Sequence, residues 1–219
     1  MTALPWRTCA FGATAVLALV LTGCTNEGDD APQSTSPTVQ LGAPGEPNRT
    51  LSPDEAAGIE QPEHTEADVA FMQMMIVHHD QAVTMTEWVD DRTTDRELRL
   101  LAERMRISQE SEMELMAGWL QDRGTPLRGD HADHAAGAMP GMLTEEQLDR
   151  LEDATGEEFE RLFLEYMIQH HTGALEMVAD LWAEGGGNEI EIGRFARDVE
   201  GDQGIEIARM QQMLAELGA

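Results

Sequence analysis

Two stretches of the chain place adjacent histidines among methionines: MMIVHHDQAVTM at residues 74–85 and YMIQHHTGALEM at residues 166–177. Imidazole and thioether together suit a soft, late transition metal, because thioether selects Cu(I) and imidazole binds both Cu(I) and Cu(II). Zinc usually recruits carboxylate or thiolate as well, and calcium or magnesium would require oxygen ligands. The two stretches therefore favour copper, with imidazoles as principal ligands and thioethers as soft partners. The candidate ligands are His78, His79, His170, His171, Met75, Met85, Met167 and Met177.

A third stretch, DHADHAAGAMPGM at residues 130–142, carries further candidate ligands in a glycine- and alanine-rich setting that shows no packing role. A tract of this composition could capture copper and pass it on, and its two aspartates could supply oxygen to Cu(II). We therefore expect a secondary metal site in this linker. Its candidate ligands are His131, His134, Met139 and Met142.

Methionine at helical spacing also fits a metal-free core, because its flexible thioether fills irregular gaps. The competing hypothesis is therefore a metal-free helical interaction module at the cell envelope, with the histidines in a polar core network. The recurrence of the histidine doublet at matching positions favours metal binding instead. Loss of Cu(I) binding on replacement of the doublets would separate the two hypotheses.

The residues that common catalytic mechanisms need are absent from the sequence. A ferritin-like di-iron oxidase needs Glu-x-x-His motifs, whereas methionine or isoleucine precedes each of the four histidines by three residues. Nucleophilic catalysis needs an activated serine, cysteine or lysine, and the chain has no lysine and no suggestive serine. A redox enzyme that oxidises Cu(I) is a third hypothesis, for which the sequence marks no electron acceptor. We therefore expect a binding protein and not an enzyme.

The doublets lie in segments whose apolar residues recur at helical spacing, and no stretch of the sequence shows sustained strand alternation. Capping boxes at Thr94–Glu97, Thr144–Gln147 and Thr155–Glu158 predict helix starts, and glycines at 124, 185–187 and 218 predict helix ends. The sequence predicts an all-α domain, an antiparallel bundle of four long helices. The expected helices are 66–90, 95–123, 157–184 and 188–217, with a short helix at 145–153.

The bundle sequence also repeats itself. A shift of 92 residues lays the first doublet on the second, and a shift of 94 lays Gln109 on Gln203 and Glu112 on Glu206. We infer two helical hairpins of common descent, packed about a pseudo-twofold axis, so that the doublets converge in the middle of the domain. The predicted organisation is repeat one at 66–123, a His/Met linker at 124–143 and repeat two at 144–217.

The N-terminus resembles a bacterial lipoprotein leader. The apolar run FGATAVLALVL has the length of a signal-peptide core and is too short to anchor in a bilayer. It ends in Leu21-Thr22-Gly23-Cys24, which resembles the lipobox whose cysteine is acylated. We expect a signal peptide at 1–23, lipidation of Cys24, which holds the protein at the cell envelope outside the cytoplasm, and a disordered tether at 24–65. Cys9 leaves with the signal, so no free thiol remains for a metal.

The chain is strongly acidic, with a formal net charge of -28 and arginine as its only basic residue. Such a surface repels phosphate backbones, which argues against nucleic-acid binding and favours cations. Because imidazole must be neutral to bind a metal, copper affinity is expected to fall below about pH 6.5. Protein partners and oligomeric state, including a homo-oligomer, are left open.

The segments FMQMMIVHHDQAVTM with ISQESEMELMAGWL, and FLEYMIQHHTGALEM with GDQGIEIARMQQML, resemble a widespread bacterial family of uncharacterised function, to which the periplasmic copper-binding protein CopM is related. The doubled M-I-x-H-H-x-x-A-x-x-M motif carries the resemblance, which covers about residues 66–217. It implies a ferritin-like bundle outside the cytoplasm and copper binding that limits metal toxicity. On the second helix of each half, the family pattern falls on Gln109, Glu112, Met116, Gln203, Glu206 and Met210.

This sequence also departs from an exact repeat. Tyr166 stands where the first half has Met74, and Gly201 and Gly204 loosen the last helix. We therefore expect the two halves to differ in detail.

Overall fold

The computed structural model describes residues 38–60, 62–129 and 139–218, and the chain divides into two compact units between Ile59 and Glu60. The predicted signal peptide and Cys24 lie outside the described residues, as do His131 and His134 of the linker. Across the described parts of the chain, no helix is both long and apolar enough to span a membrane.

The described part of the first unit, residues 38–59, falls within the segment expected to be a tether. In its described part, strand β1 (Thr38–Gln40) pairs antiparallel with β2 (Arg49–Leu51). Helix α1 (Pro53–Ala57) follows, and Ser52 caps it in a capping box with Glu55. The described part of this segment thus contains two short strands and one short helix.

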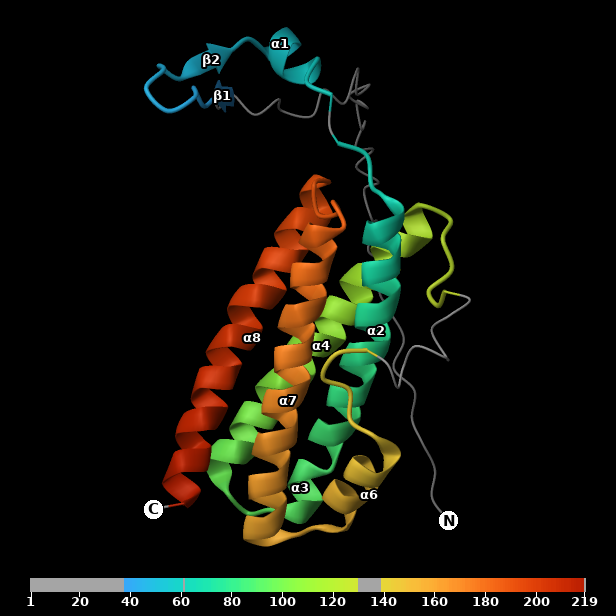
Figure 1. Cartoon of the computed structure of the whole chain (residues 1–219), viewed down its shortest axis with the longest axis vertical. Helices are drawn as coiled ribbons and strands as arrows, with labels where there is room; N and C mark the ends of the chain where they lie inside the picture. Colours follow the sequence, from blue (N-terminus) through green and yellow to red (C-terminus); the bar gives the residue numbers. More distant parts are fainter. Residues whose placement is uncertain (1–37, 61, 130–138, 219) are drawn as a thin grey trace, which may run out of the picture. The chain divides into compact units, whose positions relative to one another are not determined.

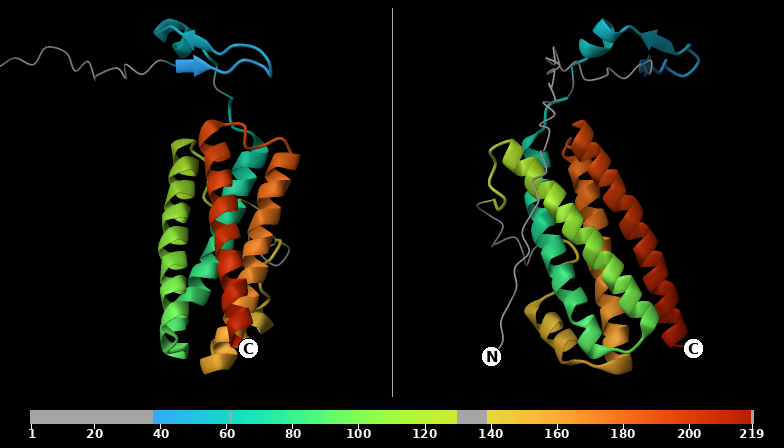
Figure 2. Two further views of the ribbon diagram at one scale, coloured as in Figure 1. Left: turned by 90° about the vertical axis from the view of Figure 1, so that its left-hand side faces the viewer. Right: turned by 180° about the vertical axis from the view of Figure 1, so that it is seen from behind.

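The second unit is helical throughout its described residues (Figure 1). Its helices are α2 (Glu66–Glu87), α3 (Val89–Arg92), α4 (Arg96–Asp122), α6 (Glu145–Asp153), α7 (Gly156–Ala183) and α8 (Ile190–Leu217). The long helices pack in pairs, α2 on α4 and α7 on α8, and α2 also packs on α7. Figure 2 shows that neighbouring helices of this bundle run in opposite directions. The prediction of a mostly helical, bundle-like domain is confirmed.

The helix starts follow from local capping, with one shift from the sequence prediction. Thr144 and Gln147 form the expected capping box at α6. At α4 the cap is Asp95 and not Thr94, because the Asp95 carboxylate accepts from the Leu98 amide at 2.7 Å. Thr155 precedes α7 as expected but makes no side-chain capping bond.

Two hydrophobic clusters fill the second unit. The Phe71 cluster lies toward the α7–α8 connection, and the Phe163 cluster lies toward α3 and α6. The main members of the Phe71 cluster are Phe71, Met75, Met116, Leu120, Ala174, Met177, Leu181 and Ile192. The main members of the Phe163 cluster are Ala82, Met85, Leu98, Met105, Phe159, Phe163, Met167 and Met210. Along both α2 and α7, the histidine doublet falls between the residues of one cluster and those of the other.

Candidate metal centre

The four histidines of the doublets lie inside the bundle, each with 0% exposed surface. His78 and His79 come from the middle of α2, and His170 and His171 from the middle of α7. Because α2 and α7 pack against each other, the two doublets meet between the hydrophobic clusters. We call these four side chains the histidine layer.

His78 and His170 are in direct contact across the two helices. Their ring centroids are 3.8 Å apart and their planes make an angle of 37°. At this separation the ring faces overlap, because rings that met edge to edge would hold their centroids farther apart. The two imidazoles are therefore adjacent, but their nitrogen lone pairs do not yet point at one common position.

His79 and His171 are each held by a carboxylate from the partner helix of the same hairpin. His79 Nε2 is 2.6 Å from Glu112 Oε2 on α4, and His171 Nε2 is 2.8 Å from Glu206 Oε2 on α8. A carboxylate on the far nitrogen is the usual way in which a metal-binding histidine is oriented and made more basic. The two glutamate side chains are mostly buried, with 16% of Glu112 and 12% of Glu206 exposed.

His78 has a different support. Its Nε2 is 3.0 Å from the Pro140 carbonyl oxygen, which comes from the segment between the two hairpins. Because carbonyl and carboxylate oxygens accept hydrogen bonds, Nε2 carries the proton in His78, His79 and His171. Nδ1 of each of these three rings is then the nitrogen with a free lone pair.

The lone-pair nitrogens of the layer are buried without partners. Among the described residues, no hydrogen-bond partner reaches Nδ1 of any of the four histidines, and His170 Nε2 is also unpartnered. Such an orphaned buried group costs about 1–3 kcal/mol, so it normally marks a strained, functional or ligand-binding position. Imidazole nitrogen is a good ligand for copper, and the donor set therefore fits the metal suggested by the sequence.

Burial keeps the central pair neutral. It lowers the pKa of His78 to about 3, with His79 acting in the same direction and the Pro140 carbonyl opposing them. Burial also lowers the pKa of His170 well below its usual range, and the neighbouring His78 lowers it further. Because burial already keeps this pair neutral at pH 6.5, we expect these two rings to lose metal affinity at a lower pH than an exposed imidazole would.

Two glutamines complete the polar interior. Gln109 on α4 and Gln203 on α8 are each 3% exposed, and neither amide group has a partner in the described part of the chain. Each lies one turn before the glutamate that holds a histidine. Both residues were placed in the repeat from the sequence but were assigned no role. Their matching positions on otherwise apolar helix faces were the signal that could have indicated a buried polar site.

The candidate methionines flank the histidine layer on both sides. Met75, Met85 and Met167 have 0% exposed surface, and Met177 has 4%. Met75 and Met177 belong to the Phe71 cluster, whereas Met85 and Met167 belong to the Phe163 cluster. The four thioethers thus divide into two pairs, each with one member from α2 and one from α7.

The end of the linker is packed on α2 and α7. We call residues 139–143 the strap. A Cβ atom at Gly173 would come within 2.1 Å of the Pro140 carbonyl oxygen, so only glycine permits this approach. The Gln81 side chain bonds both the amide of Leu143, at 2.8 Å, and its carbonyl, at 3.1 Å.

The strap corrects the expectation that its methionines have no packing role. Met139 is 7% exposed within the Phe71 cluster, and Met142 packs against that cluster. No local pattern indicated this role, because the close contact of Gly173 with Pro140 joins segments that are far apart in the chain. As ligands of a secondary site, His131, His134, Met139 and Met142 remain predictions.

The layer is not a finished coordination sphere. In the described residues, no three His, Cys, Asp or Glu side chains are arranged to hold a metal ion. The overlap of His78 and His170 gives the reason, since one ring must turn before both can bind one ion. An ion here would need that rotation, a thioether ligand, or both.

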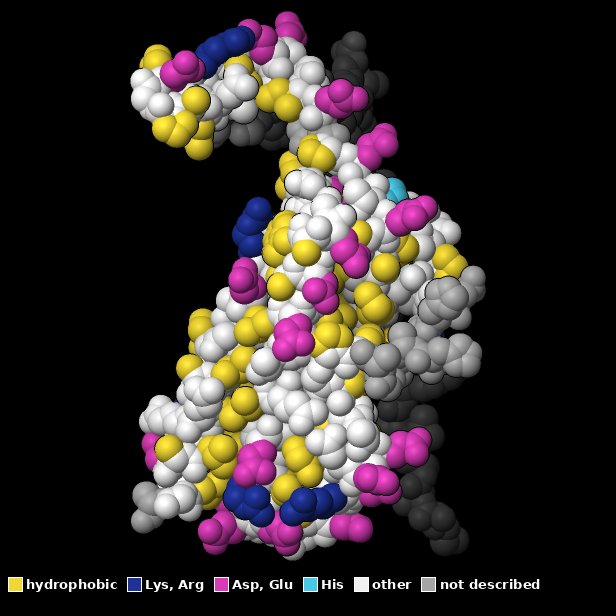
Figure 3. All heavy atoms as spheres, viewed as in Figure 1, with side chains coloured by type: hydrophobic (Ala, Val, Ile, Leu, Met, Phe, Trp, Pro, Cys, Tyr) yellow, Lys and Arg dark blue, Asp and Glu magenta, His cyan; other side chains and the backbone are white. Residues whose placement is uncertain are grey.

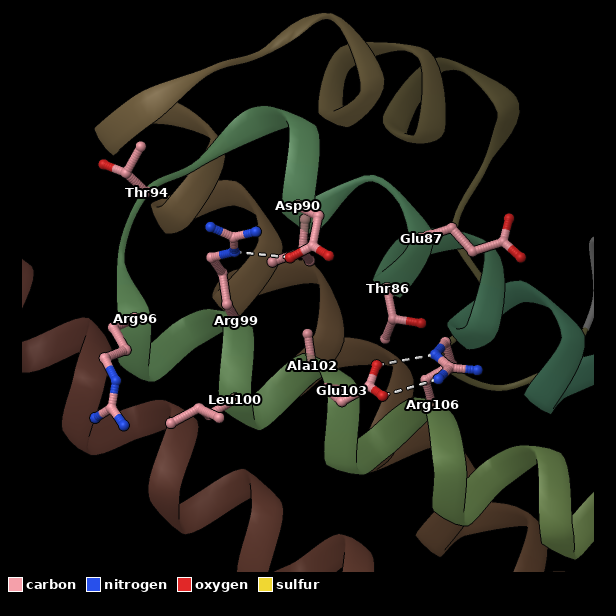
Figure 4. Close-up of a pocket in the computed structure, with 11 residues that line it drawn as sticks. Thr86, Glu87, Asp90, Thr94, Arg96, Arg99, Leu100, Ala102, Glu103 and Arg106 are labelled. Carbon is pink, nitrogen blue, oxygen red and sulfur yellow. Dashed lines mark hydrogen bonds and ion pairs between the residues drawn. The ribbon is translucent and has the colours of Figure 1, made fainter.

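Two further pockets help to delimit the site. Figure 4 shows a pocket of about 880 Å³ formed by α2, α3 and α4, in which Arg99 pairs with Asp90 and Arg106 with Glu103. It contains none of the candidate ligands. A second pocket, of about 520 Å³, is lined by Glu112, Glu206 and Asp202 and gives the two histidine-holding carboxylates a route to solvent. Burial and these two glutamates raise the pKa of Asp202.

Comparison with solved structures identifies relatives that cover more than two thirds of this chain. A candidate secreted DUF305 protein from Streptomyces coelicolor is 35% identical, with a TM-score of 0.63, over 70% of this chain and 93% of that one. CopM is 27% identical, with a TM-score of 0.56, over 68% of this chain and 96% of that one, in its Cu(I)-bound form. CopM structures with Cu(II) and with Ag match as well.

Among curated proteins, the uncharacterized protein L153 of Acanthamoeba polyphaga mimivirus is 38% identical over 56 residues. That match covers 26% of this chain, and the chain spans 37% of the viral protein. The resemblance inferred from the doubled motif is confirmed at the family level, because residues 68–214 match the family described as Domain of unknown function (DUF305). The chain therefore belongs to the DUF305 family and is structurally related to the copper-binding protein CopM.

Proposed function

We propose that this protein binds copper outside the cytoplasm and buffers or sequesters it, and that it is not an enzyme. The observation that carries the proposal is the histidine layer: four buried imidazoles, each with an unpartnered Nδ1. His78, His79, His170 and His171 act as principal ligands, with Met75, Met85, Met167 and Met177 as soft partners. The relation to CopM, whose structures contain Cu(I), Cu(II) or Ag, supports the choice of metal.

The charge of the molecule supports a cationic ligand. The formal net charge is -28, and Figure 3 shows acidic side chains over the displayed face of the bundle. An acidic surface raises the local concentration of cations and speeds their association. The neutral imidazoles of His78 and His170 add no positive charge that would repel an incoming ion.

The finer organisation belongs to the same proposal. The bundle is ferritin-like and consists of two repeated hairpins, 66–123 and 144–217, and the matching bonds of His79 to Glu112 and of His171 to Glu206 support the repeat. Cleavage after residue 23 and lipidation of Cys24 anchor the protein at the cell envelope, through a tether at 24–65. A relative described as a candidate secreted protein supports a location outside the cytoplasm.

A Cu(I) titration of the purified protein, with a competing chelator under anaerobic conditions, tests the proposal. The variant His78→Gln/His170→Gln keeps polar side chains in the layer and should lose at least one equivalent of tightly bound Cu(I). His64→Gln is the matched control, because His64 is exposed and lies outside the layer. Unchanged stoichiometry and affinity in the double variant, with intact helical circular dichroism, would contradict the proposal.

The metal-free interaction module remains the second candidate. It is favoured by the three ring nitrogens that already have oxygen partners, those of His78, His79 and His171. Under that hypothesis, the wild-type protein binds no stoichiometric Cu(I) at the layer. The same titration therefore decides between the two functions.

A further inference from the structure

A small pocket of about 200 Å³ lies on the surface of the second unit, where α2, the strap and α7 meet. Each of these three segments contributes one methionine to its lining: Met74 from α2, Met139 from the strap and Met177 from α7. Asp180 and Glu184 of α7 line the same pocket. The pocket thus brings together three thioethers from separate parts of the chain.

We propose that Met74, Met139 and Met177 form a thioether site for a soft monovalent cation, Cu(I) or Ag(I), that needs none of the four imidazoles of the histidine layer and shares only Met177 with the site proposed there. Thioether sulfur is a weak hydrogen-bond acceptor but a good ligand for such ions, and three sulfurs can complete a trigonal coordination shell. Harder ions such as Zn²⁺ and Mg²⁺ prefer nitrogen, thiolate or oxygen ligands, so the site selects by softness.

The surroundings of the three sulfurs differ from those of core methionines. Met75 and Met167 have 0% exposed surface and touch only the interior, whereas Met74 is partly exposed and shares an open pocket with Met139 and Met177. An ion can therefore approach the pocket from solvent at Met74, the most exposed of the three, whereas Met139 and Met177 are 7% and 4% exposed. Filling of an irregular core gap does not require that three methionines line the same surface pocket.

The two carboxylates supply charge at the rim. Asp180 of α7 and Glu184, the C-cap residue of that helix, are exposed and lie one and two turns beyond Met177, so both follow Met177 on the same side of the helix. Their negative potential attracts a cation, while the methionines provide the selective ligands. The described residues that line the pocket include no basic side chain.

The strap holds the third sulfur in place. Gln81 fixes Leu143 by two hydrogen bonds, and the close contact of Gly173 with Pro140 fixes the neighbouring backbone. Met139 is therefore positioned before any ion binds, which reduces the entropy lost on binding. Pro140 lines the pocket and also accepts the hydrogen bond from His78, so the thioether site and the histidine layer share a wall.

The proposal rests on the proposed function only in the choice of copper, and its test separates the two sites. The probes are Cu(I) and Ag(I) alone, added to the full-length protein under anaerobic conditions and measured by chelator competition. The variant Met74→Leu/Met139→Leu keeps apolar volume and should bind one equivalent less of each ion. Met113→Leu is the matched control, because Met113 is also partly buried against the Phe71 cluster but does not line the pocket.

X-ray absorption of the His78→Gln/His170→Gln protein loaded with one equivalent of Ag(I) provides a second readout that needs no methionine variant. A shell of three sulfur ligands is expected, and a shell dominated by nitrogen or oxygen would overturn the proposal. Full stoichiometry in the double methionine variant would overturn it as well. Failure of the histidine layer to bind copper would leave both of these outcomes unchanged, so the two failures are distinguishable.

Discussion

In the two hairpins, the second histidine of each doublet has the same kind of hydrogen-bond partner, whereas the first histidines differ in their partners. His79 and His171 are each held by a glutamate of the adjacent helix, at 2.6 and 2.8 Å. His78 donates to the Pro140 carbonyl, whereas His170 has no partner on either nitrogen within the described residues. The strap causes this difference, because it follows only the first hairpin and reaches only one of the two equivalent rings.

The methionines show the same division. Met74 lines the pocket next to the strap, whereas its counterpart Tyr166 is not among the described residues that line that pocket and carries no thioether. The comparison indicates that the repeated part of the sequence sets up the paired histidines, and that the non-repeated strap makes the two halves unequal.

The pH dependence of stability should show the largest effect. The pKa of His78 is about 3 in the folded protein and about 6.5 when exposed, so the unfolded chain binds the extra proton between these values. The free energy of unfolding of the metal-free protein should therefore fall, as pH drops from 6.5 towards 3, by about 1.4 kcal/mol per pH unit for each such ring.

Urea unfolding of wild type, His78→Gln and His170→Gln at several pH values would measure this slope. Each variant should reduce the slope by the contribution of one histidine, and His64→Gln, which changes an exposed histidine outside the layer, is the matched control. A slope that is unaffected by both variants would show that the two rings are protonated in the folded state.

Glutamate substitutions test whether the two matching histidine–glutamate bonds contribute to copper binding. Glu112→Gln and Glu206→Gln should each weaken Cu(I) binding by about 10- to 100-fold, because each removes the charge that orients a histidine ligand. Chelator competition measures the affinity. Glu114→Gln changes an exposed glutamate of the same helix and should have no effect. Very unequal effects of the two main variants would mean that His79 and His171 contribute differently.

Removal of the contact between the strap and Gly173 should leave His78 Nε2 without a hydrogen-bond partner, as His170 Nε2 already is within the described residues. A Cβ atom in Gly173→Ala would meet the Pro140 carbonyl oxygen at 2.1 Å, so the strap must move and the bond to His78 is lost. We expect a loss of about 2 kcal/mol in the free energy of unfolding, measured with urea.

Gly118→Ala provides the matched control, because Gly118 lies within helix α4 and a Cβ atom there would meet nothing within 4 Å. That variant should gain about 0.5–1 kcal/mol from the better helix propensity of alanine. If both glycine variants gained stability, the strap would not be fixed at Gly173.

The smallest effect should come from the other support of the strap. Gln81→Ala removes the two hydrogen bonds to Leu143 and should cost about 1 kcal/mol of unfolding free energy. It should also increase hydrogen exchange at the Leu143 amide, because that amide donates its hydrogen bond to the Gln81 side chain. If exchange there did not change, other contacts would be sufficient to hold the strap.

Local sequence signals were sufficient for the helices and their approximate bounds. Apolar spacing and capping residues act within a few positions of each other, so α2, α4, α6, α7 and α8 could be predicted to within a few residues. The one shifted cap, at Asp95, arose because three adjacent polar residues compete to cap the same helix and the carboxylate is the better acceptor.

The sequence by itself determined that the second unit is mostly helical, that the chain is acidic, and that two histidine doublets recur with matching glutamates. Only the tertiary structure decided which ring nitrogens have partners, that Met139 belongs to the core, and that it meets Met74 and Met177 in one pocket. The physical reason is distance along the chain. Helix periodicity repeats every few residues, whereas the bond of His78 to Pro140 joins positions 62 residues apart, through backbone packing that no local pattern encodes.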